Sequence, residues 1–538
     1  MVDHSRRRWF GLVFISLGVS LIIVDSTIVN VAIPSIVDDL GVTSTEVQWI
    51  QEAYTLVFAS LLLLFGSLAD RFGRRRMLLI GVVIFALASV LASFSPDGRM
   101  LILARLVQGV GGAMVLPTTL SLINATFRGR ERGIAFAVWG STIGGMAAVG
   151  PLLGGWLTTD FSWRWAFGIN VPLGAIIFVG VLVTIAESKE KERRGLDLVG
   201  SALSVILFGT LVFGLIEGRT YGWWTLEKPF TLGSFTWSWD LSPIPVAFAI
   251  SAVALVGFIA WGLYRRRRGR ATLLEFSLFR IGSFRNGNIA ALVVALGEFG
   301  IILSLPLWLQ FVVGFDALQT GLVLLALAVG SFVASGFAGA SSGRIRPVAI
   351  VRVGILAEIV GIAWAGFVIG PDATWGWLIP ALFVYGFGVG LATAQLTGVV
   401  LQDVPVDLSG QGSGTQSTSR QVGSALGVAI LGTVLFTTTG GVLASSLDDA
   451  GVPSAERDQI VNAVVDSAGG AIAGLGENPQ TAPFADDAKA AFSDGTRAAA
   501  FTAAGFLAVG LLATLSLGSG RRSGEEEKEK EPEASSGA

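Results

Sequence analysis

The feature that most constrains the fold of this chain is the spacing of its charged residues. Asp, Glu, Lys and Arg make up 14% of the 538 residues, whereas a soluble protein carries about 25%. These charges gather in short islands. Between the islands lie apolar runs of about 20 residues, the length that a helix needs to cross a bilayer. The sequence therefore predicts an all-α polytopic membrane protein.

Fourteen of the apolar runs are long enough to be membrane spans. We place them near residues 10–33, 47–68, 77–94, 100–123, 133–157, 166–186, 197–216, 244–264, 286–313, 318–341, 348–370, 376–401, 415–438 and 497–517. The first run follows three arginines and resembles a signal peptide, but it is too long for one and no small-residue cleavage site ends it. We interpret it as an uncleaved first helix.

The basic residues predict the orientation of these spans. Of the 37 Lys and Arg residues, 28 fall in one alternating set of connections and seven in the other. Because cytoplasmic loops carry the excess of positive charge, both termini are predicted to be cytoplasmic. Residues 439–496 then form a long outside loop with helical patterns such as "AERDQIVNAVVDSA". The charged, apolar-poor segment 518–538 is predicted to be a disordered cytoplasmic tail.

The composition excludes several kinds of chemistry. The chain has no Cys, and its single His is His4, so thiolate metal sites, cysteine nucleophiles and a histidine proton relay inside the membrane are excluded. No P-loop is present, and no metal cluster or nucleophile–base pair suggests an enzyme. We expect no cofactor, no metal and no nucleic-acid partner. Any uphill transport would then draw on an ion gradient.

Asp25 lies deep in the first apolar run, where a carboxylate costs about 2.5–3.5 kcal/mol on insertion scales. It precedes Pro34 by nine residues, which places it about 13 Å below the outer end of its helix. Arg105 follows Arg99 by six residues on a helix of opposite direction, about 9 Å below the same surface. Two lone opposite charges at matching depth can satisfy each other.

This predicted pair has two interpretations. It could be a buried ion pair that only fixes helix packing. Alternatively, it could be a proton site, because burial favours a protonated Asp25 and a nearby Arg105 favours an ionised one. Separating the two residues would then load a proton, and restoring the pair would expel it.

Further polar residues lie inside predicted spans. Glu298 falls near mid-membrane and Glu358 in the inner third, where they could neutralise a cationic substrate or carry a second proton. A misplaced helix boundary that leaves Glu358 at the inner interface is the alternative. Three amides are candidate hydrogen-bonding groups of a substrate cavity: Asn30, Gln108 and Gln310.

Several motifs, in order along both halves of the chain, resemble those of the major facilitator superfamily. The connection "GSLADRFGRRRMLLIG" (66–81) resembles its loop signature, and "GGMAAVGPLLGGWL" (144–157) resembles its antiporter motif. Further matching segments are "VDSTIVNVAIP" (24–34), "LILARLVQGVGGA" (101–113), "WRWAFGINVPLG" (163–174) and "SRQVGSALGVAILG" (419–432). These segments are similar to the branch of fourteen-helix drug:proton antiporters.

The resemblance implies a fold of two six-helix halves with a substrate cavity between them. The implied organisation is a cytoplasmic N-terminal tail (1–9), a first half (10–186), a linker with two extra helices (187–285), a second half (286–517) and the tail 518–538. An internal repeat is visible at 339–354, where Gly343 stands in the position of Asp70, so the second copy lacks the carboxylate.

The resemblance also assigns roles to the motif residues. A cytoplasmic gate is implied for Gly66, Asp70, Arg71, Gly73 and Arg74, and the antiporter motif comprises Gly145, Gly150, Pro151, Gly154 and Gly155. Glycines let helices approach closely and Pro151 bends its helix. A small-residue face on the tenth span, including Gly330 and Gly336, is a plausible partner for this motif.

These features predict a proton-driven exporter in a bacterial cytoplasmic membrane. Its substrates would be amphipathic, drug-like or secondary-metabolite-like compounds, cations among them, and it would act as a monomer. One alternative keeps the fold and exports a single endogenous metabolite or lipid-like molecule. Another is a transport-dead sensor or scaffold whose 439–496 loop binds a partner. The presence of Asp25, Arg105 and the antiporter motif argues against a dead transporter.

Overall fold

The computed structural model describes residues 4–42, 44–188, 197–232, 235–341, 344–371, 375–477 and 481–517. The predicted tail 518–538 lies outside these residues, as do the side chains of Asn30 and Pro151. The helices are α1 (His4–Leu40), α2 (Ser44–Phe72), α3 (Arg74–Ser93), α4 (Gly98–Thr126), α5 (Gly129–Asp160), α6 (Trp165–Gly168), α7 (Asn170–Thr184), α8 (Leu198–Tyr221), α9 (Pro243–Arg267), α10 (Gly282–Phe311), α11 (Ala317–Ser341), α12 (Pro347–Val368), α13 (Leu378–Leu401), α14 (Ser409–Asp449), α15 (Ser454–Asp466), α16 (Ala471–Glu477) and α17 (Ala485–Ala513). Short 3-10 turns occupy Phe276–Arg280, Trp375–Trp377, Val406–Leu408, Ala482–Phe484 and Thr514–Ser516.

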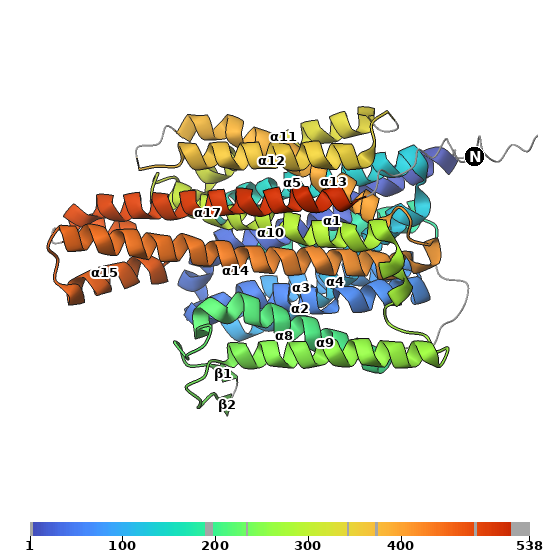
Figure 1. Ribbon diagram of the computed structural model, residues 1–538, viewed down its shortest axis with the longest axis horizontal. Coiled ribbons are helices and arrows are strands. Elements are labelled where there is room, and N and C mark those ends of the chain that lie inside the picture. The colour runs from blue at the N-terminus through green and yellow to red at the C-terminus, as the bar shows by residue number, and fades with distance from the viewer. Residues whose placement is uncertain are drawn as a thin grey trace, which may run out of the picture.

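The long helices run side by side along the long axis of the molecule (Figure 1). Among the described residues, twelve helices are long and apolar enough to cross a membrane. The prediction of an all-helical membrane fold is therefore confirmed. Two further helices, α5 and α10, have 32 and 30 residues and lie within the same bundle.

Local signals in the sequence set several helix boundaries. Gly73 separates α2 from α3 with a φ of 109°, a backbone conformation that glycine adopts without steric cost. The Asp97 side chain accepts from Met100 N at 2.9 Å and so caps α4. Proline occupies the first turn of α9 and of α12, where its missing N–H breaks no helical hydrogen bond.

The helices form two groups that meet along two seams. In the N-terminal group α1, α4, α5 and α7 pack around one another, with α2 and α3 against α4; in the C-terminal group α10, α13, α14 and α17 pack together, with α11 and α12 against α13. One seam lies between α5 and the pair α11 and α13. The other lies between α2 and α14. The packing agrees with a division into two halves.

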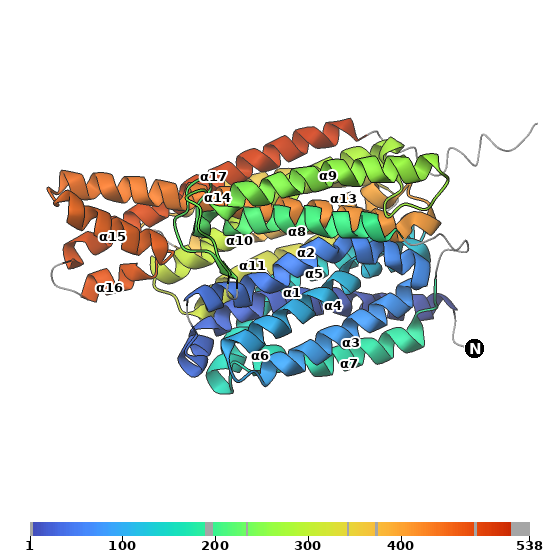
Figure 2. The same ribbon diagram turned by 90° about the horizontal axis from the view of Figure 1, so that it is seen from below.

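Helices α8 and α9 pack against each other, and α8 also packs against α2 and α14 (Figure 2). Asp197, just before α8, ties this pair to its surroundings. It accepts hydrogen bonds from Gly200 N at 2.9 Å, from the Trp261 indole at 2.8 Å and from Leu273 N at 3.1 Å. The connection between α8 and α9 contains a small antiparallel hairpin, β1 (Thr231–Leu232) with β2 (Phe235–Thr236).

The segment predicted as an outside loop, 439–496, is mostly helical. Helix α14 runs for 41 residues and ends at Asp449, and α17 already begins at Ala485. These two helices therefore extend past the ends of the predicted apolar spans, and α15 (Ser454–Asp466) confirms the helical pattern predicted at "AERDQIVNAVVDSA". The extensions pack with α15 and α16 through Leu447, Ile460, Val464, Ile472 and Leu475. This apolar core explains why polar helices persist there, at the left of Figures 1 and 2.

Candidate functional site: a buried ion pair and an interdomain helix cap

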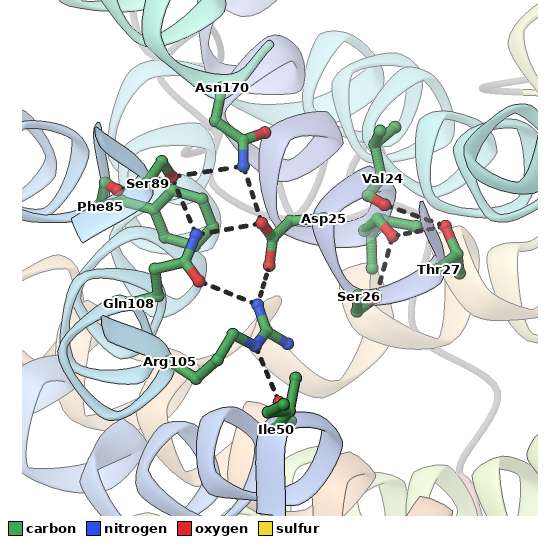
Figure 3. A network of polar contacts seen from close by, with 11 residues as sticks. Val24, Asp25, Ser26, Thr27, Ile50, Phe85, Ser89, Arg105, Gln108 and Asn170 are labelled. Carbon is green, nitrogen blue, oxygen red and sulfur yellow. Dashed lines mark hydrogen bonds and ion pairs between the residues drawn. The ribbon is translucent and has the colours of Figure 1, made fainter. Parts of the chain in front are cut away.

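Asp25 of α1 and Arg105 of α4 meet inside the N-terminal group (Figure 3). Arg105 Nη1 donates to Asp25 Oδ2 at 2.5 Å, and the two side chains are 2% and 0% exposed, respectively. The depth argument predicted a contact between these two residues, and the structure contains it. Whether the contact serves packing or proton transfer is a separate question.

The second oxygen of Asp25 is held by two amides. Asp25 Oδ1 accepts from Asn170 Nδ2 of α7 at 2.7 Å and from Gln108 Nε2 of α4 at 3.1 Å. Ser89 Oγ of α3 accepts from the same two groups, at 3.3 Å and 2.8 Å (Figure 3). One cation and two amide donors satisfy a buried negative charge, so the network fits an ionised carboxylate.

Arg105 also has partners other than Asp25. Its Nε donates to Ile50 O at 3.1 Å and its Nη1 to Gln108 Oε1 at 2.9 Å. The guanidinium lies 4.5 Å from the ring centroid of Tyr54, within the range of a cation–π contact. If the two charges separate, Arg105 keeps its hydrogen bonds to Ile50 O and Gln108, and Asp25 keeps those from Asn170 and Gln108.

The sequence analysis did not identify two members of this network. Asn170 lies within "WRWAFGINVPLG", a motif that could have pointed to it, whereas Ser89 lies in "FALASVLAS" and carries no comparable signal. Gln108 is part of the network, as described above. Gln310 is half-buried near the end of α10. The side chain of Asn30 lies outside the described residues.

A second cluster joins the two halves near the α2–α3 turn. Asp70 accepts from the backbone N–H groups of Gly410 and Gln411, at 2.7 and 2.9 Å, in the first turn of α14. Arg74 Nη2 donates to Asp70 Oδ1 at 2.6 Å and to Val406 O at 2.5 Å. Asp70 thus caps a helix of the opposite half, where a carboxylate satisfies free N–H groups and complements the helix dipole.

The glycines of this motif allow the close approach. A side chain on Gly66 would meet Gly410 O at 2.5 Å and Gly414 Cα at 2.8 Å, so α2 and α14 touch through backbone. A side chain on Gly73 would meet the carboxylate of Glu187, which accepts from Arg75 N and Arg76 N at the start of α3, both at 3.1 Å. Arg71 lies over the Phe72 ring.

The glycines of α5 face two different neighbours. A Cβ on Gly150 would collide with Thr27 of α1, and one on Gly154 would lie 2.9 Å from Ile28 Cγ1, also of α1. Gly145 instead faces Phe332 of α11. The predicted small-residue partner face on α11 is wrong at Gly330, which packs on Phe383 O of α13. No atom lies within 4 Å of a Cβ on Gly336.

Two adjacent glycines of this motif provide a matched test. Gly154→Ala places a methyl group against α1, whereas Gly155→Ala meets no atom within 4 Å. We expect Gly154→Ala to cost about 1–3 kcal/mol through overpacking and Gly155→Ala to be neutral. Thermal unfolding of the purified variants measures this difference. Equal melting temperatures for both variants would contradict the packing assignment.

The C-terminal half holds a buried ion pair of its own. Glu298 Oε2 of α10 lies 3.3 Å from Arg420 Nη2 of α14, and Thr393 Oγ1 of α13 donates to Glu298 Oε1 at 2.8 Å. Glu358 of α12 is 0% exposed, which contradicts the alternative of a solvated residue at the inner interface. Neither of its carboxyl oxygens has a hydrogen-bond partner among the described residues.

Two carboxyl groups that the sequence analysis did not identify lie between α2 and α8. Glu217 of α8 is buried and shares a side-chain hydrogen bond with Glu52 of α2. Two carboxyl groups can bond in this way only when one of them carries a proton. The inserted helices therefore attach to the N-terminal group partly through an acid pair.

Near the C-terminal end of α1, Asp39 pairs with Arg164 and accepts a hydrogen bond from the Trp163 indole at 2.9 Å. The hydrogen bonds from Arg164 and then Trp163 hold the pKa of Asp39 below its ordinary value. Because the pKa of Asp39 is lowered in the folded protein, this contact contributes stability at neutral pH and loses it as the pH falls through the lowered value. It fixes α1 to the segment before α6.

Residues 15–428 match the family described as Major Facilitator Superfamily. Three bacterial relatives illustrate the similarity. The probable actinorhodin transporter of Streptomyces coelicolor is 34% identical over 479 residues, which cover 85% of this chain and 79% of the relative. The puromycin resistance protein pur8 of Streptomyces alboniger is 34% identical over 467 residues (85% and 87%). The multidrug efflux pump LfrA of Mycolicibacterium smegmatis is 31% identical over 503 residues (93% and 94%).

Solved structures show the same fold at low sequence identity. The human organic anion transporter MFSD10 superposes with a TM-score of 0.60 at 14% identity, covering 94% of this chain and 99% of that one. The proton:xylose symporter XylE superposes with a TM-score of 0.57 at 13% identity, covering 88% and 96%.

Proposed function

This chain belongs to the Major Facilitator Superfamily, a family of multi-pass membrane transporters, and from that premise we propose that it is a proton-coupled drug antiporter. It exports amphipathic, drug-like or secondary-metabolite-like compounds, cations among them, by alternating access. The energy source is the proton gradient, with no cofactor, and the working unit is a monomer. The named relatives include a puromycin resistance protein, a probable actinorhodin transporter and a multidrug efflux pump, which supports export.

The observation that carries proton coupling is the network around Asp25. Arg105 can remain bonded to Ile50 O and Gln108 when Asp25 leaves, and Asp25 can then take a proton. These partners let Asp25 leave without stranding an unsatisfied buried guanidinium. Binding of the compound or a helix movement that separates the charges loads the proton, and re-forming the pair releases it.

The cytoplasmic gate in this proposal is the α2–α14 seam. Asp70, Arg74 and Gly66 bring the two halves into backbone contact at one end of the bundle. The positive charges predict that this end lies on the cytoplasmic side. The structure is then closed toward the cytoplasm. Glu298 and Gln310 are then candidates to contact the compound. Glu298 is itself only 3% exposed, and like the buried Gln108 and Glu358 it would reach a compound only after helix movement.

The fourteen-span topology with cytoplasmic termini is part of the proposal. The twelve apolar helices, together with α5 and α10, make up this number. Because the chain has no Cys, a cysteine introduced at Ser454 is expected to react with an impermeant thiol reagent added to intact cells. A cysteine at Ser188 is expected to stay unlabelled until the cells are opened. Equal labelling of both in intact cells would refute this topology.

Transport by purified protein in vesicles tests the function itself. We expect a pH difference across the membrane to drive accumulation of puromycin, tetracenomycin C or the permanent cation ethidium, and compound addition to move protons in the opposite direction. A pH dye and compound uptake report the two fluxes. Equal compound uptake with and without the pH difference would exclude proton coupling.

The runner-up function is export of one endogenous metabolite. The names of the actinorhodin and puromycin relatives, which each mention one compound, favour it. The same vesicle panel separates the two proposals, because an exporter of several drugs moves compounds of different skeletons and a dedicated one does not.

A further inference from the structure

A small cavity adjoins the Glu298–Arg420 pair of the C-terminal half. Its volume is about 10 Å³, and its polar lining consists of Glu298, Thr393, Thr397, Gln416 and Arg420. A cavity of this size holds about one water molecule when polar partners are present. Gln416 is 1% exposed, and its Oε1 has no hydrogen-bond partner among the described residues. The site thus has both the room and the free acceptor that a water molecule needs.

The pair differs from Asp25–Arg105 in its access to solvent. The Arg420 side chain is 16% exposed, against 2% for Arg105. The Arg420–Glu298 contact is also longer, 3.3 Å against 2.5 Å. The partly exposed Arg420 and the water-sized cavity give protons a route to Glu298 in this conformation, whereas Asp25 and Arg105 must separate before a proton can reach Asp25.

The charges around Glu298 favour a proton on the neighbouring Glu358. The titratable groups that face Glu298 are Arg420 of α14, Glu358 of α12 and Tyr385 of α13, whose hydroxyl donates to Glu298 O at 3.0 Å. On α17, Leu507 faces Gly297, the residue before Glu298. The last charged residue of α17 is Arg497, ten residues before Leu507. One arginine cannot compensate two buried carboxylates. Glu358, fully buried and without a hydrogen-bond partner, is therefore neutral.

We propose that Glu298 and Arg420 form a second proton-exchange site, in the C-terminal half, which takes up one proton per transport cycle in addition to the proton on Asp25. Glu298 takes its proton when it separates from Arg420 and releases it when the pair re-forms. Glu358 remains neutral throughout. This inference rests on the proposed proton-coupled export and adds a stoichiometry of two protons per compound.

The test measures the steady-state gradient of ethidium in proteoliposomes. Valinomycin and equal potassium concentrations hold the membrane potential at zero, and a pH difference of one unit is imposed. Each exchanged proton then supports about a tenfold gradient. We expect about a 100-fold gradient for the unaltered protein and about a tenfold gradient for Glu298→Gln, which removes the charge and keeps the shape.

Two variants control for folding and for general loss of a buried acid. The double variant Glu298→Gln/Arg420→Gln leaves no lone charge and is expected to give the same tenfold gradient. Glu217→Gln removes a buried acid outside this cluster and is expected to keep the 100-fold gradient. Glu358→Gln tests whether the neighbouring acid is the exchanging group instead.

Two results would overturn the second site. One is the same gradient in Glu298→Gln as in the unaltered protein. The other is a loss confined to Glu358→Gln. If the unaltered protein accumulates no ethidium in response to the pH difference, proton coupling itself fails, and this outcome is distinct from the other two.

Discussion

Asp25→Asn is expected to lower uphill transport about tenfold while the protein still folds and inserts. The variant keeps the partners that Arg105 has apart from Asp25, namely Ile50 O, Gln108 and the Tyr54 ring, so the arginine is not left bare. It removes the only group of this network that can bind and release a proton. With one of the two proposed protons lost, vesicles at a pH difference of one unit should show about a tenfold smaller gradient of compound and about half the proton release when compound is added. Downhill movement of compound should persist.

The companion variant Arg105→Ala acts in the opposite direction. Without the arginine, burial leaves Asp25 protonated, and export at neutral pH is expected to fail because the proton is not expelled. If the pair served packing alone, both single variants would lose protein abundance, and the double variant would regain it. Abundance and proton release, measured together for the two singles and the double, distinguish the two roles. Full uphill transport by Asp25→Asn would exclude Asp25 as the proton carrier.

Asp70→Asn is the second substitution with a large expected effect. It weakens the cap on α14 and leaves Arg74, itself buried, without its carboxylate. Breaking a buried ion pair costs about 3–5 kcal/mol, and here the cost falls on the state in which α2 and α14 are in contact. We expect transport to fall at least tenfold while insertion and compound binding remain, because the bundle of each half is untouched.

Arg76→Gln is the matched control for this test. Arg76 lies in the same connection, but its side chain is 71% exposed and lies 3.7 Å from Glu187. An exposed pair contributes little, so transport should stay near the unaltered level. The Asp70 assignment would fail if both variants transported equally well. In that case the cluster would serve orientation in the membrane rather than gating.

The sequence predicted those features that depend on one helix at a time. Apolar runs located the helices, and residue counting along two opposed helices located Asp25 and Arg105 at one depth. The partners of Asp70 were not predictable in this way, because they are backbone N–H groups 340 and 341 residues away. Ser89 was missed for a related reason, since a serine in an apolar helix carries no sign of which neighbour it faces.

Errors arose where tertiary packing overrides composition. Polarity after residue 438 predicted a loop, but α14 continues to Asp449 because α15 and α16 cover it with apolar side chains. Small residues on α11 predicted a seam with α5, and this seam exists, but Gly330 is not part of it and faces α13 instead. Small residues allow close approach without specifying the partner, so only the three-dimensional arrangement decides which helix approaches.

The acid pair between α2 and α8 limits how a twelve-helix version of this protein could be made. Excising α8 and α9 would remove Glu217 and turn Glu52 toward lipid tails, where a charged side chain is costly. It would also uncover Ser60, which Gly209 of α8 covers at close range. A shortened chain would need apolar replacements at both α2 positions. Helices α8 and α9 therefore cannot be removed alone. Their loss or gain must be accompanied by substitutions in α2.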